Sequence, residues 1–361
     1  MKILLTGATG YIGKRLLPIL IKDGHSVVCC VRDVKRFNPP ESIKQKIEVI
    51  QMDLLDEESL RKIPNNIDGA FYLVHSMSSS SNYQKLEQNS AINFKNALNK
   101  TNVKQVIYLS GIVNESKLSD HLASRKVVEN ELANGNYSLT TFRAGIIIGS
   151  GSASFEIIRD LVEKLPIMIT PKWLNTRCQP IGISDVITIL SKSILNVKTY
   201  NQNFDIGGPD ILTYKEMLLD FSRVRGLKRT IYTVPVMTPK LSSYWLYFVT
   251  STSYKLAAAL VDSMKIEVIC RDNNINSILD IIPKKYEEGK KVVLAGRLMS
   301  RRIQGKASFA ELQDSKGKIQ VYFNRDEICT SEDKTLYNEV YKKLLDIGDI
   351  ISIEGTLFTT M

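Results

Sequence analysis

Three glycines near the start of the chain have the spacing that a phosphate-binding turn requires. Gly7, Gly10 and Gly13 follow the apolar run 2–5 and lead into a helical pattern over residues 11–21. Gly7 allows a tight turn, Gly10 leaves the backbone open to a pyrophosphate, and Gly13 lets the helix pack closely against the strand. The N–H groups at the start of that helix favour an anion. We therefore expect a dinucleotide to bind here; the alternative is a glycine-rich turn without a ligand.

Two charged positions bear on which dinucleotide would bind. An acidic residue after the second strand would hydrogen-bond the ribose 2′-hydroxyl of NAD, but the chain has Arg32 there, followed by Asp33. A guanidinium suits a 2′-phosphate, so the sequence favours NADP. NAD stays open, because Arg32 could face solvent while Asp33 takes the acidic role. Asp53 follows the third strand, where a carboxylate can reach the adenine amine. The expected cofactor-binding residues are Thr6, Gly7, Thr9, Gly10, Tyr11, Ile12, Gly13, Arg32, Asp53 and Leu54.

Strand and helix patterns alternate along the first half of the chain. The expected strands are 2–5, 25–31, 47–52, 69–74, 104–109 and 138–143, with helices at 11–21, 57–62, 83–100 and 123–133. This rhythm predicts an α/β fold, a Rossmann-type doubly wound parallel sheet. Glycine and proline punctuate the chain after residue 145, which predicts a small substrate lobe within 145–282 at the carboxyl edge of the sheet.

The pattern changes near residue 283, so we expect domains at 1–282 and 283–361. A charged segment, 284–291, is followed by short alternating strands at 292–298, 308–313, 319–323 and 350–354, a hairpin turn at 314–317 and a helix at 334–345. Short strands around one helix predict a partial β-barrel of the OB-fold type.

The second domain carries the chemistry of a nucleic-acid-binding surface. Arg297, Arg301, Arg302 and Lys306 form a basic cluster without an intervening acid, which suits phosphates. Phe309 offers a ring on which a base can stack, and Gln320 offers an amide for the edge of a base. The alternative for Phe309 is a place in the core of the barrel.

Composition narrows the class of protein. The 43% hydrophobic and 24% charged residues are typical of a globular protein, and the net charge of +10 is compatible with a polyanionic partner without requiring one. The 5 cysteines are scattered without a CxxC pair, which indicates reduced thiols and a cytoplasmic location, and the 3 histidines are scattered too, so we expect no metal site. Met1 leads directly into a strand, so no signal peptide is expected. The apolar stretch 244–261 is too polar to span a membrane.

Several segments of residues 1–282 match one family in order. These are Thr6 to Gly13, Asp53-Leu54, Tyr72 to Met77, Tyr108 to Gly111, Phe142 to Gly145, Pro180 to Val186 and Phe204 to Pro209. The domain resembles an atypical, extended short-chain dehydrogenase/reductase of the NAD(P)H-binding, epimerase-like branch. The resemblance implies an oxidoreductase that acts on a small molecule, whose identity the sequence does not show.

The resemblance also places a catalytic centre, with two replacements. Active members use Ser or Thr after the fifth strand, then Tyr-x-x-x-Lys on the next helix. Ser110 fits the first role, His121 stands in place of the Tyr, and Arg125 stands in place of the Lys. Imidazole can transfer a proton near neutral pH, whereas Arg can hold a ribose but cannot release a proton. The alternatives are that His121 is a surface residue of the helix, and that the domain is a non-catalytic dinucleotide sensor or assembly factor.

Residues from about 285 to 361 resemble the N-terminal anticodon-binding OB domain of class II lysyl-tRNA synthetases. The matching stretches are 292–302, 306–314, 317–322, 337–349 and 355–358. The resemblance implies tRNA as a partner, with Phe309 stacking on anticodon uridines and Gln320 reading them. The family continues with a further strand and a catalytic domain, so we expect a truncated module without aminoacylation activity. The leading expectation is an NADP-dependent oxidoreductase with a partial tRNA-binding module. Besides the sensor or assembly factor, the second alternative function is nucleic-acid binding through the C-terminal domain.

Overall fold

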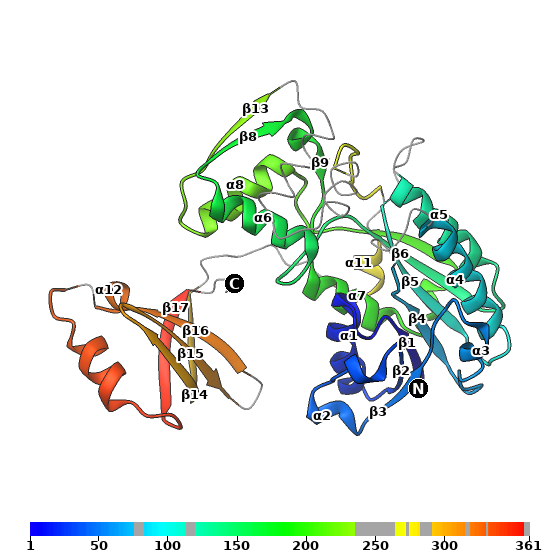
Figure 1. Cartoon of the computed structure of the whole chain (residues 1–361), viewed down its shortest axis with the longest axis horizontal. Helices are drawn as coiled ribbons and strands as arrows, with labels where there is room; N and C mark the ends of the chain where they lie inside the picture. The colour runs from blue at the N-terminus through cyan, green and yellow to red at the C-terminus, as the bar shows by residue number, and fades with distance from the viewer. Residues whose placement is uncertain are drawn as a thin grey trace. The chain divides into compact units, whose positions relative to one another are not determined.

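The computed structural model describes residues 1–75, 83–112, 120–234, 264–271, 274–281, 291–314, 318–329 and 331–356. The chain divides into two compact units, Met1–Lys285 and Tyr286–Met361 (Figure 1). The boundary expected at 282–283, most of the 284–291 segment, the turn at 315–317 and the 244–261 stretch lie outside the described residues. In the ranges described, no helix has both the length and the apolar character needed to cross a membrane.

The first unit is built on a parallel sheet whose strand order is β11-β6-β5-β4-β1-β2-β3. The strands are β1 (Lys2–Thr6), β2 (Ser26–Val31), β3 (Ile47–Gln51), β4 (Gly69–Tyr72), β5 (Gln105–Gly111), β6 (Ser138–Ala144) and β11 (Gln202–Ile206). The order reverses between β1 and β4, which confirms the doubly wound sheet, and ligands of such sheets bind at the carboxyl ends of the strands near the reversal. The sequence patterns predict the first six strands; β11 is an addition.

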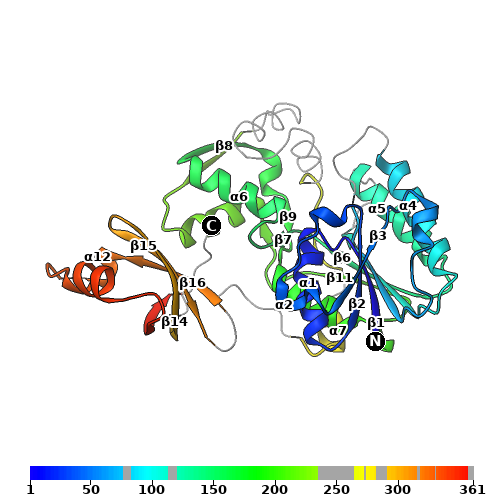
Figure 2. The same ribbon diagram turned by 60° about the horizontal axis from the view of Figure 1, so that its bottom comes forward.

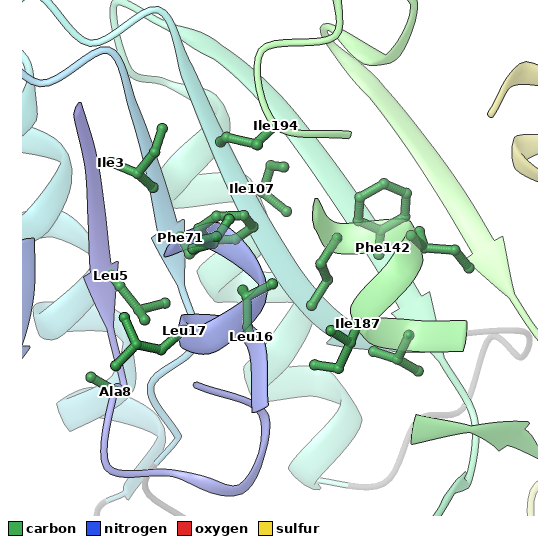
Figure 3. Packing of buried hydrophobic residues seen from close by; sticks show 14 of the residues in the cluster. Ile3, Leu5, Ala8, Leu16, Leu17, Phe71, Ile107, Phe142, Ile187 and Ile194 are labelled. Carbon is green, nitrogen blue, oxygen red and sulfur yellow. The ribbon is translucent and has the colours of Figure 1, made fainter. Parts of the chain in front are cut away.

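Helices cover both faces of this sheet (Figures 1 and 2). α1 (Tyr11–Lys22) packs against α7 (Ile183–Ser193) on one face, and α4 (Tyr83–Leu98) packs between α3 (Glu57–Leu60) and α5 (Asp120–Ala133) on the other. Short helical segments also occur at η1 (Val34–Arg36), α2 (Glu41–Lys44), η3 (Val197–Thr199) and α11 (Ile275–Ile278). Figure 3 shows side chains of the first core, among them Ile3, Leu5, Phe71, Ile107, Phe142, Leu16, Leu17 and Ile187.

A smaller lobe follows β6 and has a core of its own. It contains α6 (Ala153–Lys164), β8 (Ile167–Pro171), η2 (Lys172–Asn175), α8 (Tyr214–Val224), β13 (Thr230–Val234) and the two-residue strands β7 (Ile147–Ile148), β9 (Arg177–Cys178), β10 (Ile181–Gly182) and β12 (Leu212–Thr213). Buried side chains of α6, β8 and α8 meet in this core, Leu161, Met168 and Met217 among them. Residues 183–206 return to the sheet as α7 and β11, so the lobe comes from segments on both sides of them and is not continuous.

The second unit is an antiparallel sheet in the order β16-β15-β14-β17, curled as in half of an OB barrel. Its elements are β14 (Lys291–Gln304), β15 (Ala307–Gln313), β16 (Lys318–Asn324), α12 (Arg325–Ile328), the helical segment η4 (Leu336–Leu344) and β17 (Ile350–Thr356). The predicted end of β14 at Leu298 is wrong. A register shift between Leu298 and Ser300 lets the strand continue through the basic residues, still paired with β15.

Candidate dinucleotide site and nucleic-acid face

The three glycines between β1 and α1 differ in what they do. Gly7 has a φ of +69°, and a Cβ there would lie 2.5 Å from the carbonyl oxygen of Leu73. A Cβ on Gly13 would lie 2.2 Å from the carbonyl oxygen of Gly7. Gly10 has ordinary angles, φ −80° and ψ 173°, and its Cβ would come no closer than 3.1 Å to that oxygen. The fold therefore requires Gly7 and Gly13, whereas Gly10 is exposed and leaves room beside the helix N-terminus.

The first turn of α1 is open to an anion. Gly10 caps the helix without a side-chain hydrogen bond, and the first turn contains no acidic residue. The first N–H groups of a helix have no partner within the helix, and they carry the positive end of its dipole. This turn therefore fits the pyrophosphate of a dinucleotide.

Thr6, an expected cofactor residue, is engaged by the protein itself. Its side chain is buried; Oγ1 donates to the carbonyl oxygen of Phe71 at 2.9 Å and accepts from the Leu73 amide at 3.1 Å. These bonds join the end of β1 to the end of β4 and shape the turn. Thr9, by contrast, is exposed at the tip of the turn.

Tyr11 and Ile12 lie in the first turn of α1. The Tyr11 hydroxyl lies so close to the lobe that a Cβ on Gly149 would be 2.6 Å from it, and burial raises the pKa of this phenol. The Arg15 guanidinium covers the Tyr11 ring at 4.0 Å and donates to the carbonyl oxygen of Ser150 at 2.7 Å. Tyr11 therefore connects α1 to the lobe, while Ile12 lines the cavity described below.

Arg32 and Asp33, the two charged residues after β2, differ in their contacts. The Asp33 carboxylate accepts from the Lys35 amide at 2.9 Å, which caps η1, and it pairs with Arg36 at 3.5 Å. Arg32 is exposed, and its side chain makes no ion pair with a described residue. The acidic side chain is thus committed to its own turn, and the guanidinium is the group presented at the end of the strand.

Asp53 and Leu54 follow β3. The Asp53 carboxylate accepts from the Leu55 amide at 3.0 Å, which forms a local turn. The Leu54 side chain is buried in the core beneath α4, and its carbonyl oxygen accepts from Asn93 at 3.0 Å. Only the backbone of Leu54 would therefore be able to contact a cofactor.

A cavity of about 270 Å³ lies at the carboxyl edge of the sheet. Its walls come from the first turn of α1, the ends of β4, β5 and β6, α5 and the lobe. The lining residues that matter for chemistry are Ile12, His75, Ser110, Arg125, Tyr214 and Met264. The structure thus brings two of the three expected catalytic residues, Ser110 and Arg125, to one cavity beside the glycine turn. His121 lies in the first turn of α5, and its side chain is outside the described part of the structure.

Buried polar and charged side chains near Ser110 and Arg125 shift one another's pKa values. The Ser110 hydroxyl is buried. Burial raises the pKa of the neighbouring Tyr108 phenol to about 12, against the opposing effects of Arg125 and Ser110. Burial also lowers the pKa of the Arg125 guanidinium, while Tyr108 and Glu87 act in the other direction. A cation held in such surroundings interacts more strongly with developing negative charge than it would in water.

A hydrogen-bonded network at the same cavity was not predicted from the sequence. His75 follows β4, and its Nδ1 lies 3.0 Å from Oε1 of Glu87 on α4. The second carboxylate oxygen of Glu87 accepts a hydrogen bond from the Ser124 hydroxyl on α5. A signal was available: Glu87, Ser90, Ala91, Phe94 and Leu98 are the buried positions of α4, so a carboxylate occupies the face of the helix that turns inward.

In the second unit, Phe309 and Gln320 lie on the same face of the sheet. Phe309 is opposite Tyr322 and Gln320 is opposite Glu311 in the β15–β16 register. Phe309 and Tyr322 have ring centroids 5.1 Å apart, and Gln320 is exposed. The small core uses the alternate positions of the strands, with Leu298, Ala310 and Leu312 at its centre. Phe309 is therefore not a core residue, and we call the side that bears it the outer face.

The four residues of the basic cluster do not lie on one surface of the sheet. Arg302 is opposite Phe309 and exposed on the outer face, and Arg297 shares that face while donating to the Gly348 carbonyl oxygen at 2.6 Å. Arg301 lies on the opposite side, where its guanidinium donates to the Tyr341 carbonyl oxygen on η4.

Lys306, in the turn between β14 and β15, lies 3.7 Å from the carboxylate of Asp326. Lys318 forms an ion pair with Glu311 at 2.8 Å, which places an acidic group on the outer face. Arg302 is thus the cluster residue best placed to meet a phosphate.

Family models match both parts of the chain. Residues 7–143 match the NAD(P)H-binding family, and residues 292–360 match the OB-fold nucleic acid binding domain. The C-terminal part is similar to lysine–tRNA ligases: 80% identical over 79 residues to that of Christiangramia forsetii, and 61% over 69 residues to that of Azobacteroides pseudotrichonymphae. These alignments cover 22% and 19% of the chain and 14% of each ligase, so the chain spans about one seventh of those relatives.

Solved structures share the fold of the first unit. A nucleoside-diphosphate-sugar epimerase from Staphylococcus aureus has a TM-score of 0.65 at 18% identity, covering 79% of this chain and 98% of its own. An NADPH-dependent quinone oxidoreductase from Escherichia coli, solved with NADPH, has a TM-score of 0.63 at 17% identity over 78% and 96%. A Citrobacter triphenylmethane reductase, solved with NADP(H), has a TM-score of 0.64 at 16% identity over 79% and 97%. The protein thus joins an NAD(P)H-binding domain with a reductase- and epimerase-like fold to a C-terminal OB-fold domain related to the anticodon-binding domain of lysine–tRNA ligases.

Proposed function

We propose that the first unit is an NADP(H)-dependent oxidoreductase that reduces a carbonyl group of a small organic substrate. The observation that carries this proposal is the cavity that joins Ile12, beside the glycine turn, to Ser110 and Arg125. A nicotinamide and a carbonyl compound must meet in such a space, since hydride transfer requires close approach of the two reacting carbons.

Two features support NADP(H) as the cofactor. The open N-terminus of α1 would hold the pyrophosphate, and the exposed Arg32 would bind the 2′-phosphate in two-point hydrogen bonds. Asp33 is held by its own turn and by Arg36, so its carboxylate is a poor partner for the 2′-hydroxyl of NAD. Two structural neighbours were solved with NADPH or NADP(H).

When bound, the reduced dinucleotide supplies the hydride. The Ser110 hydroxyl would donate a hydrogen bond to the substrate carbonyl oxygen and orient it. Arg125 would hold the ribose and stabilise negative charge that develops on that oxygen, but it cannot give up a proton. The reaction therefore needs a separate proton donor, and His121 is the residue that the family resemblance assigns to this role.

The test is NADPH consumption in the presence of a panel of aldehydes, ketones and quinones. Turnover in the wild-type protein should fall about a hundredfold or more in Ser110→Ala, with NADPH affinity nearly unchanged. Tight NADPH binding without turnover of any substrate would contradict the proposal and favour a dinucleotide sensor or assembly factor.

We propose RNA binding, with tRNA as the partner, for the second unit. The observation that favours it is the shared outer face of Phe309, Tyr322, Gln320 and Arg302, where two rings, an amide and a cation are presented together. Aromatic rings stack on unpaired bases, and amides read base edges. Polarisation of a labelled, uridine-rich anticodon stem-loop tests this proposal; no binding even at low salt would overturn it. Both proposed activities are compatible with a cytoplasmic location.

A further inference from the structure

His75 and its two partners form a connected unit at the cavity. The imidazole side chain is 28% exposed and lines the cavity, whereas Glu87 and Ser124 are buried. Nδ1 of His75 meets one oxygen of the Glu87 carboxylate at 3.0 Å, and Ser124 donates to the other. Three elements meet here: the end of β4, α4 and α5.

This arrangement determines which ring nitrogen can exchange a proton. An ionised carboxylate can only accept hydrogen bonds, so with Glu87 in that form the hydrogen of this contact lies on Nδ1 of His75. Nε2 is then the nitrogen that can gain and lose a proton, on a ring that lines the cavity. A histidine whose Nδ1–H is held by a carboxylate is the arrangement by which enzymes orient an imidazole and stabilise its cationic form.

The charged and titratable neighbours are consistent with this role. Arg125 on α5, Tyr72 on β4 and Tyr108 on β5 all interact electrostatically with Glu87. Burial keeps both phenols protonated at neutral pH, since it raises their pKa values far above 7. Glu129 on α5 also interacts electrostatically with Tyr108. Glu87 faces two cations, Arg125 and the imidazolium, when His75 is protonated.

Burial of a carboxylate on a helix face destabilises the folded state unless hydrogen bonds and ion pairs offset the free energy of desolvation. The alternative explanation is that Glu87 has only a structural role, in which it connects α4 to α5 and to the end of β4. That role would not require a titratable ring, nor the exposure of that ring to a cavity that also contains Ser110.

We propose that His75 is the proton donor of this site and that Glu87 and Ser124 are positioning residues, an inference that rests on the reductase function proposed above. As the substrate carbonyl carbon accepts the hydride with its electron pair, the C=O π bond breaks and the oxygen takes a proton from Nε2 of His75. The imidazole is left neutral with its hydrogen on Nδ1, the substrate becomes an alcohol, and a proton from solvent restores the imidazolium. Glu87 keeps its hydrogen bond to Nδ1 throughout.

Turnover in three His→Gln variants tests the inference, with pH–rate profiles. His75→Gln should lose about a hundredfold or more in turnover and lose the pH-dependent limb of the profile, with NADPH affinity and melting temperature near wild type. His25→Gln is the matched control and should retain turnover. If His121→Gln loses the limb while His75→Gln retains turnover, His75 is not the donor. A loss of turnover in His75→Gln that leaves the shape of the profile unchanged would indicate a structural role and would also overturn the proposal.

A second measurement does not depend on turnover. The chain has 3 histidines, so ¹⁵N signals of the imidazoles can be assigned with the same three variants. His75 should carry its hydrogen on Nδ1 in the neutral form, and this preference should disappear in Glu87→Gln. A neutral His75 with its hydrogen on Nε2 would overturn the inference even if no substrate is found, whereas absence of turnover with the expected tautomer would count against the reductase function only.

Discussion

Gly13 packs so closely against Gly7 that a Cβ on Gly13 would lie 2.2 Å from the Gly7 carbonyl oxygen. A real Cβ does not approach backbone this closely, so any side chain at residue 13 must push α1 away from the turn. A Cβ on Gly10, three residues earlier, would lie 3.1 Å from the Gly7 carbonyl oxygen, so the protein without a ligand has much more room there.

Substitutions at these two glycines should therefore have different effects. Gly13→Ala should lower the free energy of unfolding by about 3 kcal/mol, the upper range for overpacking, because the obstacle is backbone. Gly10→Ala should change the free energy of unfolding much less but weaken NADPH binding, and Gly10→Val should abolish it. Denaturant unfolding and NADPH titration, run on the same three variants, measure both effects. Normal NADPH affinity in Gly10→Val would show that the turn does not hold a pyrophosphate.

Arg32→Gln should reduce the preference for NADPH over NADH. A hydrogen bond to a charged group contributes about 1.5–3 kcal/mol, so NADPH affinity should fall roughly 10- to 100-fold while NADH affinity stays nearly constant. Arg223→Gln, which removes an exposed, ion-paired arginine of the lobe, is the control. Equal affinities for the two cofactors in the wild type would exclude a 2′-phosphate site at Arg32.

The outer face of the OB domain should separate base recognition from phosphate binding. Phe309→Ala should reduce the preference for the uridine-rich stem-loop over a purine-rich loop, because it removes a stacking ring. Arg302→Gln should weaken binding to both loops and lower the slope of log affinity against log salt by about one unit.

Lys343→Gln, on η4, is the control for Arg302→Gln because Lys343 already pairs with Glu339 at 2.8 Å. If Phe309→Ala binds both loops as the wild type does, the ring contributes nothing to recognition and the outer face is not the base-reading surface.

The stability of the first unit should fall below neutral pH in part because of His25. Burial and the chain's N-terminal amine lower the pKa of His25, against the opposing effect of Asp23, and its Nδ1 is buried without a hydrogen-bond partner among the described residues. The unfolded chain then binds a proton more readily than the folded one, so stability rises with pH. The His25 contribution is fully present above about pH 6.5, the unfolded value, and is lost as pH falls below it.

Unfolding free energies at pH 7.5 and pH 5.5, compared between the wild type and His25→Gln, measure this contribution. The variant should show the smaller difference between the two pH values. An equal difference in both proteins would mean that His25 titrates alike in the folded and unfolded states.

The sequence by itself determined the features that depend on neighbouring residues. A strand, a glycine turn and a helix over residues 2–21 are specified by local backbone preferences, and six strands of the parallel sheet follow from short apolar runs of strand length. The glycine turn was predictable for the same reason, and its role as a phosphate site stays a prediction. The alternation along Ala307–Gln313 likewise puts Phe309 and Ala310 on opposite faces of one strand.

Tertiary structure decided what depends on distant pairing. Which face of β15 is covered depends on β14, β16 and β17, and that choice places Phe309 outside the core. The basic cluster is divided in the same way, because Arg301 faces η4 while Arg302 faces outward.

His75, Glu87 and Ser124 meet only because α4 packs against α5 beside the end of β4, joining residues 12 and 37 positions apart. Sequence periodicity records which side of a helix is buried, but not which residues of another element it meets, because that partner is set by the order of the sheet and the packing of its helices.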